Sequence, residues 1–261
     1  MILKMCRSVK STCALLILIP FFSAWADQVP VMSQRNIEPA TELRVFAKRG
    51  DTTYVAELKV QQESELISKS FRLGGSRRIF SHLKIGAYYL LQNGVLHNED
   101  WVQNPDQNWG WRDTSSRVEH ALMVEVTPQT VLPSDENWIA ECKTRIVFNA
   151  FNQQWTLKVR PGVSYLWTKQ DRPFLSFFSQ LEFYLPLNYG KSIIYETWLY
   201  FGALYYYSTT FQLGGYGAWK TVKWESPKIF DVITSQSFEV HDNSPVLGFV
   251  AIWNFDFFGS S

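Results

Sequence analysis

Apolar and polar side chains alternate with a period of two through most of this chain. In 154–168, Trp155, Val163 and Trp167 share one side of an extended backbone with further apolar residues, while Lys158 and Arg160 lie on the other side. Successive side chains of a β-strand point to opposite faces, so this segment has one apolar, aromatic face and one polar, cationic face. About ten such residues, at the tilt of a barrel strand, cross the core of a bilayer, whereas ordinary strands average about five or six. The pattern therefore predicts a membrane-spanning strand.

The same alternation recurs along the chain and is interrupted by short turns and by two long polar loops, 93–115 and 221–245. The further segments are 42–48, 52–61, 69–77, 83–92, 117–126, 138–148, 174–185, 196–206, 211–220 and 246–258. Together these make eleven strands, but single-chain bacterial barrels have an even number. We therefore predict an all-β antiparallel transmembrane barrel over 40–258 with twelve strands, or ten as the alternative. The missing strand is expected within 28–38 or in a long loop, and 27–39 is assigned as a polar leader or weak first strand.

The first 26 residues have the order of parts found in a secretory signal peptide. Lys4, Arg7 and Lys10 precede an apolar run, and the small-residue site Ala24-Trp25-Ala26 follows it. The apolar run is too short for a transmembrane helix, and no later run reaches the length of about 18 residues that such a helix needs. We expect cleavage before Asp27.

Charge and cysteine content exclude several classes of function. Removal of the signal peptide takes away three of the 25 basic residues and none of the 24 acidic ones, so 22 basic residues remain and the net charge is about −2. This balance does not favour a nucleic-acid partner. Cys142 is then the one remaining cysteine, so we expect no disulfide framework and no metal site. Aromatic residues make up 16% of the chain, which is typical of barrels with Trp and Tyr girdles at the membrane interfaces.

These features resemble the bacterial outer-membrane β-barrel superfamily of Gram-negative cells. The last segment alternates Leu247, Phe249, Trp253 and Phe255 in the manner of the C-terminal signal of such barrels. The resemblance implies an outer-membrane location, contact with outer-membrane lipid and delivery by the barrel-assembly machinery. Gly259-Ser260-Ser261 trails the final Phe, which departs from that signal.

Two groups within the superfamily are similar to this chain. Small twelve-stranded porins for acidic oligosaccharides have lumens lined with Arg and Lys. Uncharacterised barrels of similar length carry an inward Glu in an aromatic strand, here Glu182, followed by a strand in which Arg precedes Tyr and Gly. This chain has Trp198 at the position of that Arg.

The alternation places a large set of charged side chains on the face opposite the apolar one. Charges are costly against lipid, so these residues are expected to face the lumen and to line a pore. The predicted lumen residues are Glu42, Arg44, Glu57, Lys59, Arg72, Lys84, Arg117, Glu119, Glu125, Glu141, Lys143, Arg145, Lys158, Arg160 and Glu182. Such residues select small polar or charged solutes in a porin-like channel or transporter. The alternative is a plugged structural or adhesive barrel, in which they neutralise each other.

No catalytic motif is found in the sequence, and no cofactor is expected. An outer-membrane lipid hydrolase is a further alternative, because enzymes of that kind have a catalytic Ser and His on the outer wall of the barrel. His120 lies on the apolar face of its segment, but Ala121 and Leu122 follow it where a His-x-Ser spacing would be required. The sequence does not indicate an oligomeric state.

Overall fold

The computed structural model describes residues 37–63, 66–94, 101–103, 109–111, 117–133, 135–189, 194–225, 232, 235 and 239–256. The predicted signal peptide and cleavage site lie outside this part of the chain. The strands are β1 (Glu38–Arg49), β2 (Thr52–Glu63), β3 (Leu66–Phe80), β4 (Leu83–Asn93), β5 (Trp101–Gln103), β6 (Trp109–Trp111), β7 (Val118–Val131), β8 (Trp138–Asn149), β9 (Gln154–Lys169), β10 (Arg172–Pro186), β11 (Glu196–Tyr206), β12 (Phe211–Glu225) and β13 (Glu239–Asp256).

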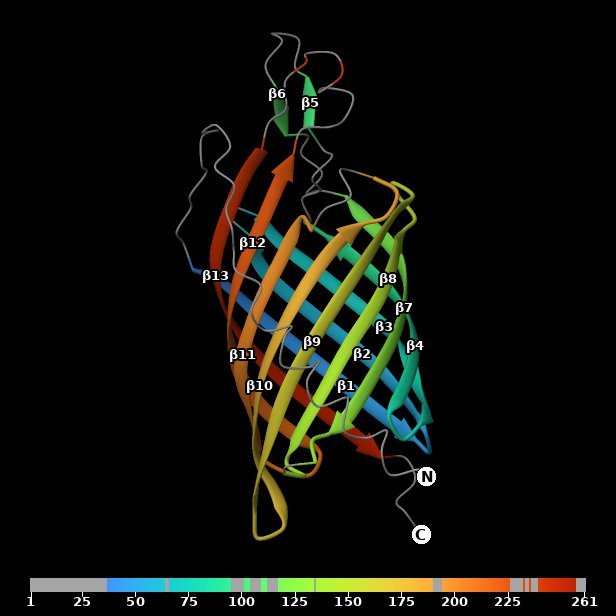
Figure 1. The fold of residues 1–261 in the computed structure, drawn as a ribbon, viewed down its shortest axis with the longest axis vertical. Coiled ribbons are helices and arrows are strands. Elements are labelled where there is room, and N and C mark those ends of the chain that lie inside the picture. Colours follow the sequence, from blue (N-terminus) through green and yellow to red (C-terminus); the bar gives the residue numbers. More distant parts are fainter. Residues whose placement is uncertain are drawn as a thin grey trace, which may run out of the picture.

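Eleven of these strands form one closed barrel, with β5 and β6 in a separate two-stranded sheet. Consecutive barrel strands pair antiparallel, and the strands are tilted against the barrel axis (Figure 1). The alternation of apolar and polar residues favours a barrel, because a closed sheet puts the apolar face of every strand outside and the polar face inside.

The predictions of twelve or ten strands are wrong. With eleven strands, the first and last run in the same direction, and β1 pairs parallel with β13 from Glu38–Val246 to Lys48–Asp256. A parallel ladder closes an odd-numbered barrel, so the described residues need no twelfth strand. One proposed place for a missing strand, the loop over 93–115, instead contains β5 and β6, which join no barrel strand. The other, 28–38, lies mostly outside the described residues, although its last residue, Glu38, begins β1.

The prediction of a long loop over 221–245 is wrong at both edges. The antiparallel ladder between β12 and β13 continues to the pair Glu225–Glu239. In this extension the outer face is polar, since the Thr221 hydroxyl donates to Asn243 Oδ1 over 2.8 Å, while Val222 is buried on the inner face. The apolar positions therefore change from the outer to the inner face after Lys220, so this part of the strand does not have the pattern expected of a lipid-facing wall.

The two rims of the barrel differ in their connections. We call the rim where β1 joins β2 the turn end, because all five connections there are short. The opposite rim, the loop end, carries the connection from β4 to β7, and Figure 1 shows β5 and β6 beyond this rim. The connections from β10 to β11 and from β12 to β13 lie at the loop end too, so both predicted long loops lie at one rim.

The outer wall is largely apolar, with polar exceptions such as Thr221 and Asn243 near the loop end. Large hydrophobic side chains that are at least one-third exposed alternate along the strands, as Leu122, Val124 and Val126 do on β7. At the turn end, aromatic rings form contacts between neighbouring strands. The pairs are Trp138–Tyr165, Trp167–Phe174, Phe174–Tyr205 and Phe211–Trp253, with ring centroids 4.5 to 5.5 Å apart. At the loop end, Phe148 and Trp155 make a similar contact at 4.7 Å.

Candidate functional site in the barrel lumen

The lumen contains a cavity of about 940 Å³ that every barrel strand helps to line. Thirteen of the fifteen predicted lumen residues line it, and Arg117 and Glu119 do not. Residues of the turn end also line it, among them Lys48, Thr210 and Asp256, so the cavity reaches that rim. Among the described residues, nine cationic and six anionic side chains line the cavity, which leaves an excess of positive charge.

A first ion-pair cluster lies on β1, β2 and β3. Arg44 contacts Glu42 on its own strand, and its Nε lies 3.1 Å from Glu57 Oε2. Arg72 donates from Nη2 to the same Glu57 oxygen over 2.7 Å. The register brings these residues together, because Glu42 pairs with Lys59, Arg44 with Glu57 and Glu57 with Arg72. Cross-strand neighbours of opposite charge thus neutralise one another on one wall of the lumen.

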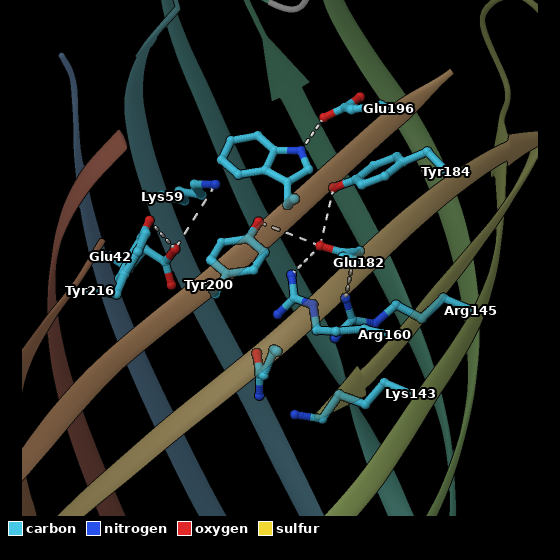
Figure 2. A network of polar contacts seen from close by, with 12 residues as sticks. Glu42, Lys59, Lys143, Arg145, Arg160, Glu182, Tyr184, Glu196, Tyr200 and Tyr216 are labelled. Carbon is cyan, nitrogen blue, oxygen red and sulfur yellow. Dashed lines mark hydrogen bonds and ion pairs between the residues drawn. The ribbon is translucent and has the colours of Figure 1, made fainter. Parts of the chain in front are cut away.

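A second ion-pair cluster, on β7 to β10, is centred on Glu182. Its carboxylate is fully buried, and it accepts hydrogen bonds from Arg145 Nη1 at 3.2 Å and Arg160 Nη2 at 2.5 Å. Arg145 also donates from Nε to Glu125 Oε2 over 2.6 Å. Figure 2 shows the guanidinium groups of Arg145 and Arg160 directed to the same carboxylate. A buried charge is tolerated where it is both paired and hydrogen-bonded, and Glu182 meets both conditions.

Two tyrosines link the clusters. The Tyr216 hydroxyl donates to Glu42 Oε1 over 2.9 Å, and the Tyr200 hydroxyl lies 3.5 Å from Glu182 Oε2. The two rings meet edge to face with centroids 5.8 Å apart (Figure 2). Gly248 makes room for this arrangement, because a Cβ there would come within 2.1 Å of the Tyr216 ring.

The lumen lysines differ in their partners. Lys143 forms an ion pair with Glu141 at 2.8 Å, and Lys158 lies over the Tyr184 ring, 4.3 Å from its centroid. Lys48 and Lys84 line the cavity nearer the turn end, and neither takes part in an ion pair within the described residues. Unpaired cations therefore gather in the open part of the cavity.

The loop half of the lumen is filled by side chains. Trp198 is 3% exposed and lies near two cations, Lys59 at 5.3 Å and Lys220 at 5.7 Å from its ring. Lys220 donates to Glu38 Oε2 over 2.8 Å, and Gln61 reaches the same oxygen at 3.4 Å. Trp198, Gln61, Glu38 and Lys220 do not line the cavity, and neither do Ala121, Val222 and Val246, whereas Lys59, Gln92, Lys158 and Tyr184 do.

The two predicted residues that do not line the cavity lie at the loop end. Glu119 is buried and accepts hydrogen bonds from Asn149 Nδ2 at 2.7 Å and Gln92 Nε2 at 3.0 Å. Arg117 precedes β7 and lies over the Phe151 ring, 4.8 Å from its centroid. Glu119 therefore stabilises the filled half of the lumen.

Sequence reasoning missed several members of the network. Glu38 was assigned to the leader although it is an inward residue of β1. Lys220 and the tyrosines lie on the inward face of the predicted strands, so the alternation already marks them as lumen residues. The Trp198 ring occupies the position where the resemblance implied an Arg, and its indole nitrogen donates to Glu196. Arg145 and Arg160 supply the cationic partners of Glu182 instead.

His120 and Cys142 are the residues of the outward face that the sequence analysis considered. His120 faces outward, and its Nδ1 forms a hydrogen bond with the Tyr89 hydroxyl. Cys142 is free and half-buried. Over the described part of the chain, no group of three or more His, Cys, Asp or Glu side chains could hold a metal ion. Within the same residues, no helix is long and apolar enough to cross a membrane.

Comparisons with models of protein families, with curated proteins and with solved structures find no match to this chain. The proposed function therefore rests on the fold and on the contacts in the lumen.

Proposed function

We propose that this chain is a barrel of the bacterial outer membrane that acts as a porin-like channel or transporter for small polar or charged solutes. The wall facing outward supports insertion into a membrane, because its large apolar side chains are exposed and alternate with inward charges. Aromatic contacts near both rims, such as Trp167–Phe174 and Phe148–Trp155, fit the girdles that barrels place at lipid headgroups. The signal peptide and delivery by the assembly machinery belong to the same proposal.

One observation carries the transport function: the charged cavity that runs from the turn end to the two ion-pair clusters. A cavity of about 940 Å³ is large enough for a small solute. Its cationic side chains outnumber its carboxylates, and low-dielectric walls focus this field on ions inside. We therefore expect small anions to enter in preference to cations.

The filled loop half favours a second candidate, a plugged structural barrel. Gln61, Ala121 and Val246 are each only 1% exposed, and none of the three lines the cavity. A small barrel that is packed with side chains gives a rigid wall and no passage. The lipid hydrolase remains a third alternative, supported only by the outward His120 with its Tyr89 contact.

Electrical recording of the refolded protein in a planar bilayer tests the proposal. We expect discrete conductance steps, and in a salt gradient a reversal potential that indicates anion preference. Charge reversal at Arg145 or Arg160 is a poor probe, because these residues hold the buried Glu182. Lys48→Glu and Lys84→Glu leave both clusters intact and are expected to shift the reversal potential towards cation preference, most clearly at low salt.

The matched control is Arg172→Glu, because Arg172 is exposed in β10 near the turn end and does not line the cavity. It is expected to leave the reversal potential unchanged. A membrane-inserted protein that never conducts would favour the plugged barrel. Release of fatty acid from phospholipid that is lost in His120→Ala would instead favour the hydrolase.

A further inference from the structure

The two ion-pair clusters face each other across the lumen with arginine towards arginine. Arg44 and Arg160, from β1 and β9, repel each other electrostatically, and so do Arg72 and Arg145, from β3 and β8. None of the ion pairs that these four residues form within the described chain crosses from one cluster to the other. No ion pair of these arginines therefore joins the two clusters, although the Glu125 carboxylate attracts Arg72 across the lumen.

Three buried donors in this region are unsatisfied. The Nε atoms of Arg44, Arg72 and Arg160 are shielded from solvent and have no hydrogen-bond acceptor, although Arg44 Nε lies 3.1 Å from Glu57. A buried donor without an acceptor costs about 1 to 3 kcal/mol, and more for a charged group. All three side chains line the cavity, so an oxyanion that enters from the turn end can reach their guanidinium groups.

We propose that the lumen binds a small multivalent oxyanion between the first and second ion-pair clusters, held by Arg44, Arg72, Arg145 and Arg160. A guanidinium group presents its N–H donors in a planar fork that matches phosphate and carboxylate oxygens. An anion here supplies acceptors to the unsatisfied donors and removes the repulsion between the facing arginines. The excess of cations along the cavity favours its entry.

This inference deepens the proposed transport function, since it names the class of solute that the cavity holds. Phosphate groups and dicarboxylates share the required chemistry. Two parallel experiments distinguish these ligands. One uses inorganic phosphate and the other succinate, and each is compared with chloride at matched ionic strength.

The test is thermal unfolding and calorimetric titration of the refolded full chain in detergent. Phosphate, succinate or both are expected to raise the unfolding temperature above that in chloride, as any ligand of the folded state does. The double variant Arg44→Lys with Arg160→Lys keeps a positive charge beside each carboxylate but removes two Nε donors. Its affinity for the bound oxyanion is expected to fall roughly tenfold or more.

Arg172→Lys is the matched control, because Arg172 is exposed and lies outside the cavity. It should bind the oxyanion as the original chain does. If the double variant does not fold, Arg44→Lys alone and the side-chain Nε–H resonances of the unmodified protein give the second measurement. Those resonances are expected to shift with phosphate or succinate and not with chloride.

The inference is overturned if neither oxyanion stabilises the protein beyond chloride, or if the lysine variant and the control bind equally well. The outcome that contradicts the proposed transport function is a different one. A barrel that conducts but does not bind oxyanions contradicts only the inference, whereas one that binds them but never conducts contradicts only the transport function.

Discussion

The loop half and the turn half of the lumen share one wall but have opposite interiors. In the loop half, inward side chains such as Trp198, Gln61 and Ala121 are buried, and the buried charges Glu38 and Lys220 bind each other. In the turn half, Lys48 is exposed, and neither Lys48 nor Lys84 forms an ion pair among the described residues. Both ends of the barrel therefore carry lumen charges, but the turn end includes two cations, Lys48 and Lys84, that have no ion-pair partner among the described residues.

The difference shows how charge in a barrel interior divides between stability and solute selection. A buried pair contributes to a defined fold because loss of either partner leaves an uncompensated charge. An unpaired, hydrated cation adds little to stability, but its field acts on every ion that enters. The clusters around Glu42 and Glu182 lie between these extremes, since they are paired and still line the cavity.

The largest effect is expected at Glu182, where the paired and open regions meet. Glu182→Gln removes the carboxylate that two arginines share and leaves Arg160 without an ion-pair partner. Loss of one partner of a buried pair costs about 3 to 5 kcal/mol. Urea unfolding of the barrel refolded in lipid vesicles measures this loss.

Glu136→Gln is the control for that change. Glu136 is an exposed residue of the turn-end connection between β7 and β8, so its loss should alter the unfolding free energy by no more than about 0.5 kcal/mol. Equal stability of the Glu182 variant and the control would show that the second ion-pair cluster does not hold the barrel together.

Trp198→Ala is expected to open the loop half of the lumen and so to remove the difference between the two halves. Removal of a buried Trp costs about 3 kcal/mol or more and leaves a cavity between Lys59 and Lys220. Single-channel conductance should rise, because the new space joins the lumen cavity to the loop end. Trp219→Ala is the matched change on the outer wall, and it should not raise the conductance. An unchanged conductance in Trp198→Ala would place the barrier elsewhere.

Thiol labelling compares the two halves directly. On a Cys142→Ala background, Ser176→Cys places a thiol in the cavity of the turn half, and Ala121→Cys places one in the loop half, where Ala121 is 1% exposed. A charged thiol reagent should modify the first roughly a hundredfold faster, because the second reacts only after local opening that costs about 2.7 kcal/mol. Similar rates would mean that both halves are open to water.

Alternation predicted which face each residue occupies, and thirteen of the fifteen predicted charged positions line the lumen cavity, while Arg117 and Glu119 do not. It did so because a period of two maps directly onto the two sides of a barrel wall. The same alternation carries no information on the position of a residue along the barrel axis. It therefore could not show that Glu119 lies in the filled half while Lys84 lines the open one.

The strand count failed for a different reason. The even number was taken from single-chain bacterial barrels, whereas the closure of this barrel depends on the direction of β1 relative to β13. Nothing in the local sequence of β1 records its parallel partner, because parallel and antiparallel ladders use the same backbone groups. Contacts between strands that are not paired, such as that of Tyr216 on β12 with Glu42 on β1, are similarly hidden, since the two residues are far apart in the chain.

The smallest effect on stability is expected at Lys84. Lys84→Gln removes a cation of the open half that has no ion-pair partner among the described residues, so the unfolding free energy should change by no more than about 0.5 kcal/mol. The reversal potential should nevertheless move towards cation preference, and the shift should shrink as salt is raised, because added ions screen a charge that lines the cavity. Lys220→Gln is the counterpart in the filled half: it takes a hydrogen-bonded partner from buried Glu38, so it should lower stability more and leave ion preference where it was. If Lys84→Gln destabilises the barrel as much as Lys220→Gln does, the cations of the open half are structural, and the two halves of the lumen do not differ in role.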